Sequence, residues 1–157
     1  MESLTVPQIL EMTQQETKRL TESFERLDRA EVILAQMPQV ECPVSHSFTP
    51  GLYQRTFKVP AGTIVTSKIH MTEHPYVMTE GLMLVWIEGK AVTVRAPCFG
   101  VTKPGTRRLA YAIEDTVWTT FHVTDETDVD KIEEQIIFKH DAHLKGLVAQ
   151  PSIEGKQ

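Results

Sequence analysis

The sequence is short of cysteine, of positive charge and of long apolar stretches. Two thiols among 157 residues, Cys42 and Cys98, cannot build a disulfide framework, so both are expected to stay reduced. The net charge of −5 gives no bulk attraction to nucleic acid or to an anionic membrane. No apolar run reaches the roughly 18 residues of a membrane span, and residues 1–12 lack the pattern of a secretory signal. We therefore expect a cytoplasmic protein with neither a nucleic-acid polymer nor a membrane as partner.

Several signatures of enzymes are missing as well. The chain has no Ser-His-Asp signature, no Gly-rich loop of the kind that cradles phosphate and no C-x-x-C pair. Nucleophilic or redox chemistry of those classes therefore has no support in the sequence.

The N-terminal part of the chain is predicted to be helical and is followed by a linker. Residues 1–38 contain a stretch from Thr13 to Met37 without Gly or Pro, in which apolar residues recur at helical spacing, and Pro38 ends it. Such a helix must bury its apolar stripe on the next domain or against a helix of another chain. Residues 39–51 are rich in Pro and turn formers and are predicted as the linker.

The rest of the chain is predicted as a β domain followed by a short helix. In residues 52–124, short runs rich in Val, Ile, Thr, Tyr and Phe alternate with Gly- and Pro-containing turns, which is typical of a sandwich or barrel. A hairpin is expected to turn at Glu88–Lys90. Residues 125–157 hold a capping residue, acids, a short amphipathic helix and a tail.

A histidine motif in this β region resembles a zinc-peptidase site. His70, Glu73 and His74 spell H-x-x-E-H, in which two His on one helix would hold a metal and the Glu would act as base. The residues before His70 are β-branched, however, and Pro75 pushes His74 out of the helical region. We therefore expect no peptidase site.

The same histidines fit the period of a strand. With alternating sides, Lys68 and His70 share one face, and Thr120 and His122 share a face in the last predicted strand. If both faces line a barrel, its mouth is polar and carries imidazoles. Three neutral imidazoles around an open position suit a divalent metal.

The segment from Val59 to Gly81 resembles the first conserved motif of the cupin superfamily, in which H-x-H is followed by Glu and a closing Gly. Lys68 and His70 occupy the two His positions, His74 occupies the Glu position and Gly81 the closing Gly. The resemblance implies a cupin-type double-stranded β-helix, or jelly-roll barrel, flanked by an N-terminal α-helix and a short C-terminal α-helix.

The segment APCFGVTKPGTRR resembles the second cupin motif, P-x-G-x-x-H. Gly105 matches the Gly, and Arg108 stands where the last His ligand would be. Over most of the chain, the sequence also resembles small cupin-like proteins encoded by tailed bacteriophages, most of them without an assigned function. That likeness implies the fold and a location in the host cytoplasm rather than a reaction.

Three interpretations of the histidine cluster stay open. It is a metal site, a metal-free cationic pocket for an anionic ligand, or a set of structural hydrogen-bonded histidines. The predicted metal ligands are His70, His74 and His122. The predicted ligand-binding residues are Lys68, Glu73, Arg107, Arg108, Tyr111, Trp118 and Thr120.

The favoured function is a phage-type cupin that binds Fe, Mn, Ni or Zn and binds or acts on a small molecule, with an anionic one as an option. The alternative is a metal-free binder of a small molecule or nucleotide, or a host-interaction protein, without catalysis. Whether the protein is an enzyme stays open. By analogy with cupins, the chain is expected to form a homodimer or a larger homo-oligomer.

Overall fold

The computed structural model describes residues 6–138 of the chain. In these residues, nine strands lie between a long and a short helix. The elements are α1 (Val6–Ala35), β1 (Val44–Thr49), β2 (Leu52–Val59), β3 (Ile64–Thr66), β4 (His74–Glu80), β5 (Leu82–Ile87), β6 (Lys90–Arg95), β7 (Cys98–Thr102), β8 (Arg108–Ala112), β9 (Thr116–Val123) and α2 (Val129–Ile136).

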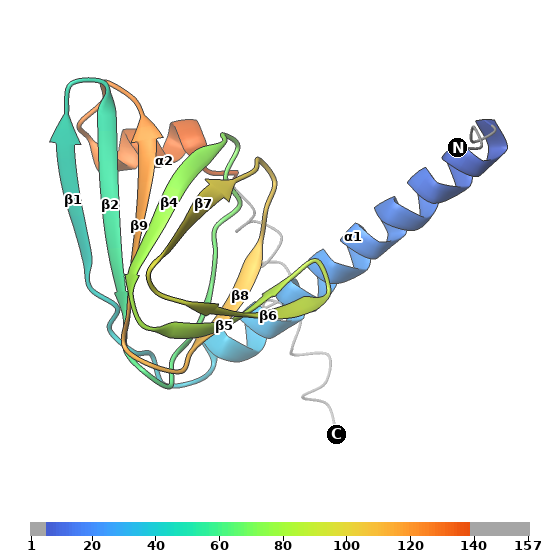
Figure 1. Ribbon diagram of the computed structural model, residues 1–157, viewed down its shortest axis with the longest axis horizontal. Coiled ribbons are helices and arrows are strands. Elements are labelled where there is room, and N and C mark those ends of the chain that lie inside the picture. Colours follow the sequence, from blue (N-terminus) through green and yellow to red (C-terminus); the bar gives the residue numbers. More distant parts are fainter. Residues whose placement is uncertain (1–5, 139–157) are drawn as a thin grey trace, which may run out of the picture.

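The strands form two antiparallel sheets that close into a barrel (Figure 1). One sheet has the order β1-β2-β9-β4-β7 and the other has the order β3-β8-β5-β6. Leaving β1 aside, both sheets interleave early and late strands in the paired Greek-key order of a jelly roll. The predicted cupin-type jelly-roll barrel with an N-terminal and a short C-terminal helix is therefore confirmed.

The apolar core lies between the two sheets at the end of the barrel farther from α2. Its buried members come from β2, β4, β5 and β8 and include Val59, Met78, Met83 and Ala112. Along β2, Tyr53, Arg55, Phe57 and Val59 share one side of the strand and line the interior, with Tyr53 and Val59 buried and the two between them half-buried. This period of two gives each strand an inward row that lines the barrel.

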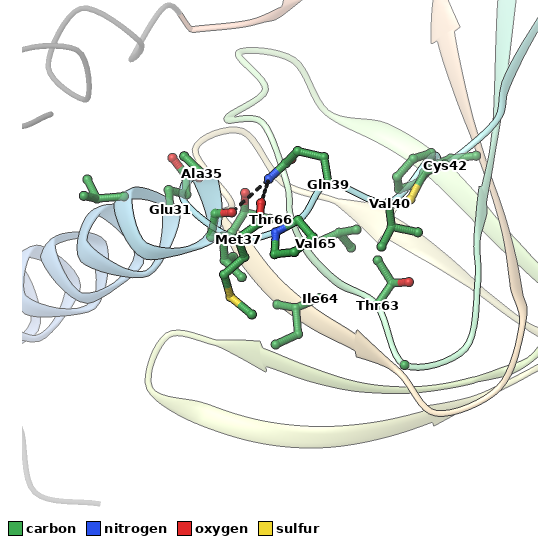
Figure 2. Close-up of a pocket in the computed structure, with 15 residues that line it drawn as sticks. Glu31, Ala35, Met37, Gln39, Val40, Cys42, Thr63, Ile64, Val65 and Thr66 are labelled. Atoms are coloured by element: carbon green, nitrogen blue, oxygen red, sulfur yellow. Dashed lines mark hydrogen bonds between the residues drawn. The ribbon is translucent and has the colours of Figure 1, made fainter.

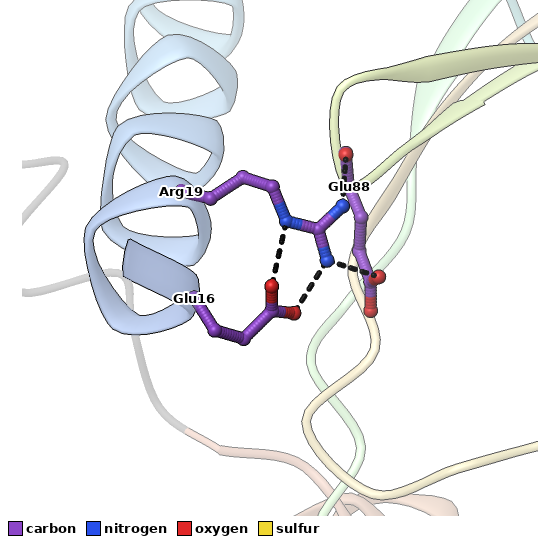
Figure 3. Close-up of polar contacts among 3 residues, drawn as sticks. All are labelled: Glu16, Arg19 and Glu88. Carbon is purple, nitrogen blue, oxygen red and sulfur yellow. Dashed lines mark hydrogen bonds and ion pairs between the residues drawn. The ribbon is translucent and has the colours of Figure 1, made fainter. Parts of the chain in front are cut away.

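The hairpin between β5 and β6 turns at Glu88 and Gly89, as predicted. Both residues have positive φ, which matches the twist of a tight two-residue turn. The turn also contacts α1, because the guanidinium of Arg19 binds the carboxylates of Glu16 and Glu88 (Figure 3). These exposed ion pairs link the helix to the hairpin but contribute little stability.

Helix α1 lies on the barrel with its C-terminal part, whereas its N-terminal part extends away from it (Figure 1). Leu27 of the predicted apolar stripe is 1% exposed, and Arg107 lies over the ring of Phe24. Beneath the helix, Arg107 binds the carboxylates of Asp28 and Glu31. The helix thus buries part of its stripe on its own barrel, the first of the two predicted arrangements.

The predicted linker 39–51 is a linker only in its first part. Its second part contains β1, which pairs with β2 along its whole length. All six side chains of β1 are exposed, so no row of buried apolar residues marks this strand. The sequence of such an edge strand resembles that of a loop, because the strand is held by backbone hydrogen bonds to its neighbour rather than by buried side chains.

Helix α2 closes one end of the barrel. Asp128 caps its N-terminus by accepting hydrogen bonds from the backbone N–H groups of Asp130 and Lys131. Its apolar face packs Ile132, 0% exposed, and Ile136 against Tyr53 of β2. Within residues 6–138, no helix combines the length and the apolar character needed to cross a membrane. The predicted tail after Lys145 lies outside the described residues.

Candidate metal centre

A cavity of about 210 Å³ lies inside the barrel beneath α2. Its floor is apolar and includes Val59, Met83 and Trp118. Its other end is lined by histidines and by the long cations Arg55 and Arg108. The chamber therefore has one apolar end and one basic end.

His70 reaches the cavity from an irregular segment, not from the end of a long strand as predicted. Strand β3 ends at Thr66, and His70 makes an isolated antiparallel bridge with Ile137 just after α2. The backbone N–H of Met71 donates to the carbonyl of Ile136 at 2.7 Å, and that of Phe138 to the carbonyl of Ile69 at 2.8 Å. The C-terminal segment thus holds this histidine in place.

The other two histidines stand on neighbouring strands. His74 opens β4 and is 2% exposed, while His122 lies near the end of β9 and is 3% exposed. Strands β4 and β9 pair directly, so both rings enter the cavity from the same sheet. None of the three histidines lies on a helix, as predicted, so the H-x-x-E-H spelling lacks the helix on which the peptidase motif holds its metal.

The three imidazoles form a compact cluster. The ring centroids of His70 and His74 are 4.4 Å apart, those of His74 and His122 are 4.5 Å apart, and those of His70 and His122 are 5.5 Å apart. One potential ligand nitrogen from each ring lies within 4.8 Å of the others. Such spacing suits three nitrogen ligands around one ion, for which each bond to zinc would be about 2.0–2.1 Å.

Each ring is also anchored through a hydrogen bond. His74 Nδ1 lies 3.2 Å from the carbonyl oxygen of Thr72, and His122 Nε2 lies 3.0 Å from Thr120 Oγ1. The His70 ring bonds to the backbone of Lys68. An outer partner of this kind fixes the tautomer of a metal-binding imidazole and leaves its second nitrogen for the metal.

The second nitrogen of His122 provides the most direct indication of a metal. Its Nδ1 is buried without a hydrogen-bond partner among the described residues. A buried polar atom without a hydrogen-bond partner raises the free energy of the folded state, so its presence here needs an explanation. A metal ion bound at this nitrogen supplies one.

The rings are held in their neutral form, which is the form that binds metal. Burial lowers the pKa of His70 from 6.5 to about 3, and the neighbouring His74 and His122 add to the effect. Burial and then His74 lower the pKa of His122 to about 4. Burial also lowers the pKa of His74, although the hydrogen bond to Thr72 opposes the shift. No proton therefore competes with a metal near neutral pH.

Two of the predicted cations line the cavity. Lys68 lies at its rim, where its ammonium forms an ion pair of 2.9 Å with Glu133 of α2. Arg108 reaches across from β8, donates from Nη2 to Thr102 Oγ1 at 3.1 Å and lies over the ring of Tyr76. Burial lowers the pKa of Arg108.

Trp118 and Thr120 lie in the cavity as predicted. Both line it from β9, where Trp118 stacks on Tyr76 with ring centroids 4.4 Å apart. Thr120 is hydrogen-bonded to His122 and so supports the cluster. Their contact with a ligand stays a prediction.

Three predicted ligand-binding residues lie elsewhere. Arg107 is 3% exposed and binds Asp28 and Glu31 of α1, because its side chain points to the outer side of the barrel beneath the helix. Tyr111 is 39% exposed, on the side of β8 opposite to the cavity-lining Ala110. Glu73 is exposed and pairs with Lys103 at 2.9 Å. None of the three lines the cavity.

Arg55 and Tyr53 line the cavity but were not predicted. Both belong to the inward row of β2, where Arg55 is opposite Thr120 and Tyr53 is opposite His122. The Tyr53 ring stacks on His122 at 5.8 Å, and its hydroxyl lies 2.7 Å from His46 Nδ1. The alternation in residues 52–59 carries this signal, because Tyr53, Arg55 and Phe57 share one face.

A larger cavity of about 550 Å³ lies between the C-terminal end of α1 and β3 (Figure 2). Gln39 lines it and donates from Nε2 to the carbonyls of Leu34 and Met37 at 3.0 and 2.8 Å. Most of its lining is apolar, and its one carboxylate, Glu31, is engaged by Arg107. The groups able to do chemistry gather in the smaller cavity.

Comparison with known proteins gives structural relatives alone. No protein-family model matches the chain, and no curated protein matches it either. Among solved structures, a cupin-2 domain protein of Shewanella frigidimarina is 14% identical with a TM-score of 0.43, covering 60% of this chain and 91% of its own. KdgF of a Halomonas species is 19% identical with a TM-score of 0.46, covering 59% of this chain and 88% of its own.

A eukaryotic structure is similar as well. The cupin domain of Cnp3 from Schizosaccharomyces pombe is 13% identical with a TM-score of 0.46, covering 64% of this chain and 71% of its own. The Shewanella and Schizosaccharomyces structures are named as cupins. The strand order of the two sheets, rather than these scores, supports the jelly-roll assignment.

Proposed function

We propose that this protein is a divalent-metal-binding cupin that takes a small molecule beside its metal. His70, His74 and His122 would hold the ion. The observation that carries the proposal is the buried Nδ1 of His122, which has no partner in residues 6–138 and belongs to a cluster of neutral imidazoles.

A bound metal would supply Lewis acidity and a fixed attachment point for a ligand oxygen or nitrogen. The chain itself supplies the surroundings. Thr120 and the backbone at Thr72 orient the rings, and α2 lines the cavity with Glu133 and Ile136. Whether the bound molecule is transformed or only held stays open, because the fold hosts both kinds of protein.

Metal analysis tests the proposal. The protein is purified without an affinity tag that binds metal and without chelator, and its Fe, Mn, Ni and Zn content is measured. We expect stoichiometric metal in the wild type and in His46→Ala, and its loss in His70→Ala and in His122→Ala. His46 is a matched control because it lies on β1 outside the cluster and bonds to Tyr53.

A protein that stays free of metal after incubation with each of these ions would contradict the proposal. The metal-free binder predicted as the alternative would then be favoured. The cavity volume also restricts that alternative, because about 210 Å³ is below the roughly 300–1,000 Å³ of pockets for drug-sized ligands. A nucleotide would not fit inside, whereas a small acid would.

We further propose, from the sequence resemblance, that the chain is a bacteriophage protein, works in the host cytoplasm and forms a homo-oligomer. Light scattering coupled to size-exclusion chromatography tests the last point. A mass equal to one chain at every concentration would contradict it.

A further inference from the structure

Two guanidinium groups, one from each sheet, line the cavity that holds the histidine cluster. Arg55 comes from β2 and lies beside the His122 end of β9, through its pairing with Thr120. Arg108 comes from β8 in the other sheet and bonds to Thr102, the residue paired with His74. Both side chains line the cavity.

Neither guanidinium is neutralised by an acid. Among the ion pairs of the described residues, Arg19, Arg95 and Arg107 each have a carboxylate, whereas Arg55 and Arg108 have none. Glu133, the acid that lines the cavity, already forms an ion pair with Lys68. The cavity therefore holds two cations without counter-charges, although the whole chain carries a net charge of −5.

Such an arrangement is unfavourable in the empty protein. Placing a charge in a poorly solvated site costs free energy unless an opposite charge balances it. Burial indeed lowers the pKa of Arg108. A bound anion would remove this cost, and guanidinium forks match carboxylate and phosphate oxygens.

The far end of the cavity is apolar. The inward-facing residues of β2 and β9 line the cavity in successive pairs. Arg55 is paired with Thr120, and the next inward pair is Phe57 with Trp118. Beyond them lie Val59 and Met83 of the core. A ligand that fills this space has an anionic head near the histidines and an apolar body directed towards the core.

We infer that the ligand of this cavity is a small amphipathic organic acid, whose anionic head is bound between Arg55 and Arg108 and whose apolar part rests on Trp118. The inference rests on the proposed small-molecule site and names its ligand class. It does not require that the metal be present, because the two arginines are not metal ligands.

Titration calorimetry with benzoate and butyrate tests the inference, with benzamide and butyramide as neutral analogues of the same shape. We expect each acid to bind at least about tenfold more tightly than its amide. Inorganic phosphate distinguishes a general anion site from a site for an organic acid. A site that makes no contact between the ligand and the apolar floor would bind phosphate as tightly as benzoate. Three outcomes would overturn the inference: phosphate bound as tightly as benzoate, acid and amide bound equally, or no acid bound at all.

The variants Arg55→Gln and Arg108→Gln test whether these two arginines bind the anionic head of the ligand. Each is expected to weaken benzoate about tenfold or more, whereas Arg95→Gln, which removes an exposed arginine paired with Glu114, should leave binding unchanged. Unchanged benzoate binding in both cavity variants would overturn the assignment. Metal content is measured on the same samples, so failure of the metal site and failure of the anion site are seen separately.

Thermal unfolding without ligand distinguishes a binding role from a structural one. If Arg108 serves an anion, Arg108→Gln leaves the Tm of the ligand-free protein unchanged or raises it, and abolishes the stabilisation by benzoate. A large drop in Tm without ligand, with the benzoate-dependent increase retained, would show that Arg108 is structural and overturn the inference.

Discussion

The guanidinium of Arg107, before β8, lies 2.6 Å from the carboxylate of Asp28 on α1, and both side chains are almost fully buried. Removing one partner of a buried ion pair leaves the other charge without compensation. We expect Arg107→Met to lower the free energy of unfolding by about 3–5 kcal/mol, measured by urea denaturation. The double variant with Asp28→Leu should regain part of the loss.

The matched control for that pair is on the surface. Lys103 pairs with Glu73 with both side chains exposed, so Lys103→Met should cost less than about 1 kcal/mol. Equal losses for Lys103→Met and Arg107→Met would contradict the structural role of the buried pair.

Thr120 supports His122 through its hydroxyl, whereas Thr119 bonds to Thr56 instead. If His122 binds metal, Thr120→Val removes the group that orients its ring. The metal affinity is expected to fall about 10–100-fold, measured by competition with a fluorescent chelator. Thr119→Val, one residue away, should bind metal as the wild type does; an equal loss in both variants would indicate general damage to β9.

The metal-free protein should lose stability in acid through its histidines. The pKa values of His70 and His122 in the folded state, about 3 and about 4, lie below the unfolded value of 6.5. Below about pH 6.5 these histidines bind protons in the unfolded chain but not in the folded chain. The free energy of unfolding therefore falls as the pH drops from about 6.5 towards these folded-state values.

Urea denaturation of protein treated with chelator, between about pH 7 and about pH 5, measures this dependence. His122→Phe should make it shallower, because one of the buried rings is gone. The same slope in His122→Phe and in the wild type would show that His122 does not contribute.

Ile132 of α2 is 0% exposed and packs against Tyr53, which lines the cavity. Ile132→Ala should cost about 2–5 kcal/mol of stability and speed up the release of bound metal to a chelator. Ile33→Ala is the control, since Ile33 of α1 is 61% exposed. Release at the wild-type rate from a destabilised Ile132→Ala protein would mean that α2 does not control access.

The sequence predicted the fold well because its signals are local. The alternation of residues, the Gly- and Pro-rich turns and the cap at Asp128 each depend on near neighbours. Strand β1 was missed, since its residues are exposed on both sides and its order depends on pairing with β2.

The candidate site was only partly predictable for a related reason. His70, His74 and His122 were named together, and the structure brings them together. Arg107 and Arg108 are adjacent in sequence, yet one points beneath α1 and the other into the cavity. Adjacent side chains at the start of β8 face opposite sides, and only the resemblance to the second cupin motif indicated that Arg108 is the inward one.

The bridge between His70 and Ile137 makes the cluster depend on widely separated parts of the chain. One histidine is held by the segment after α2, another opens β4 and the third lies on β9. A chain that lacks residues 129–138 would leave His70 without that support. Metal uptake would then report that the barrel and its closing segment have assembled, and a truncated product would be recognised by its empty centre.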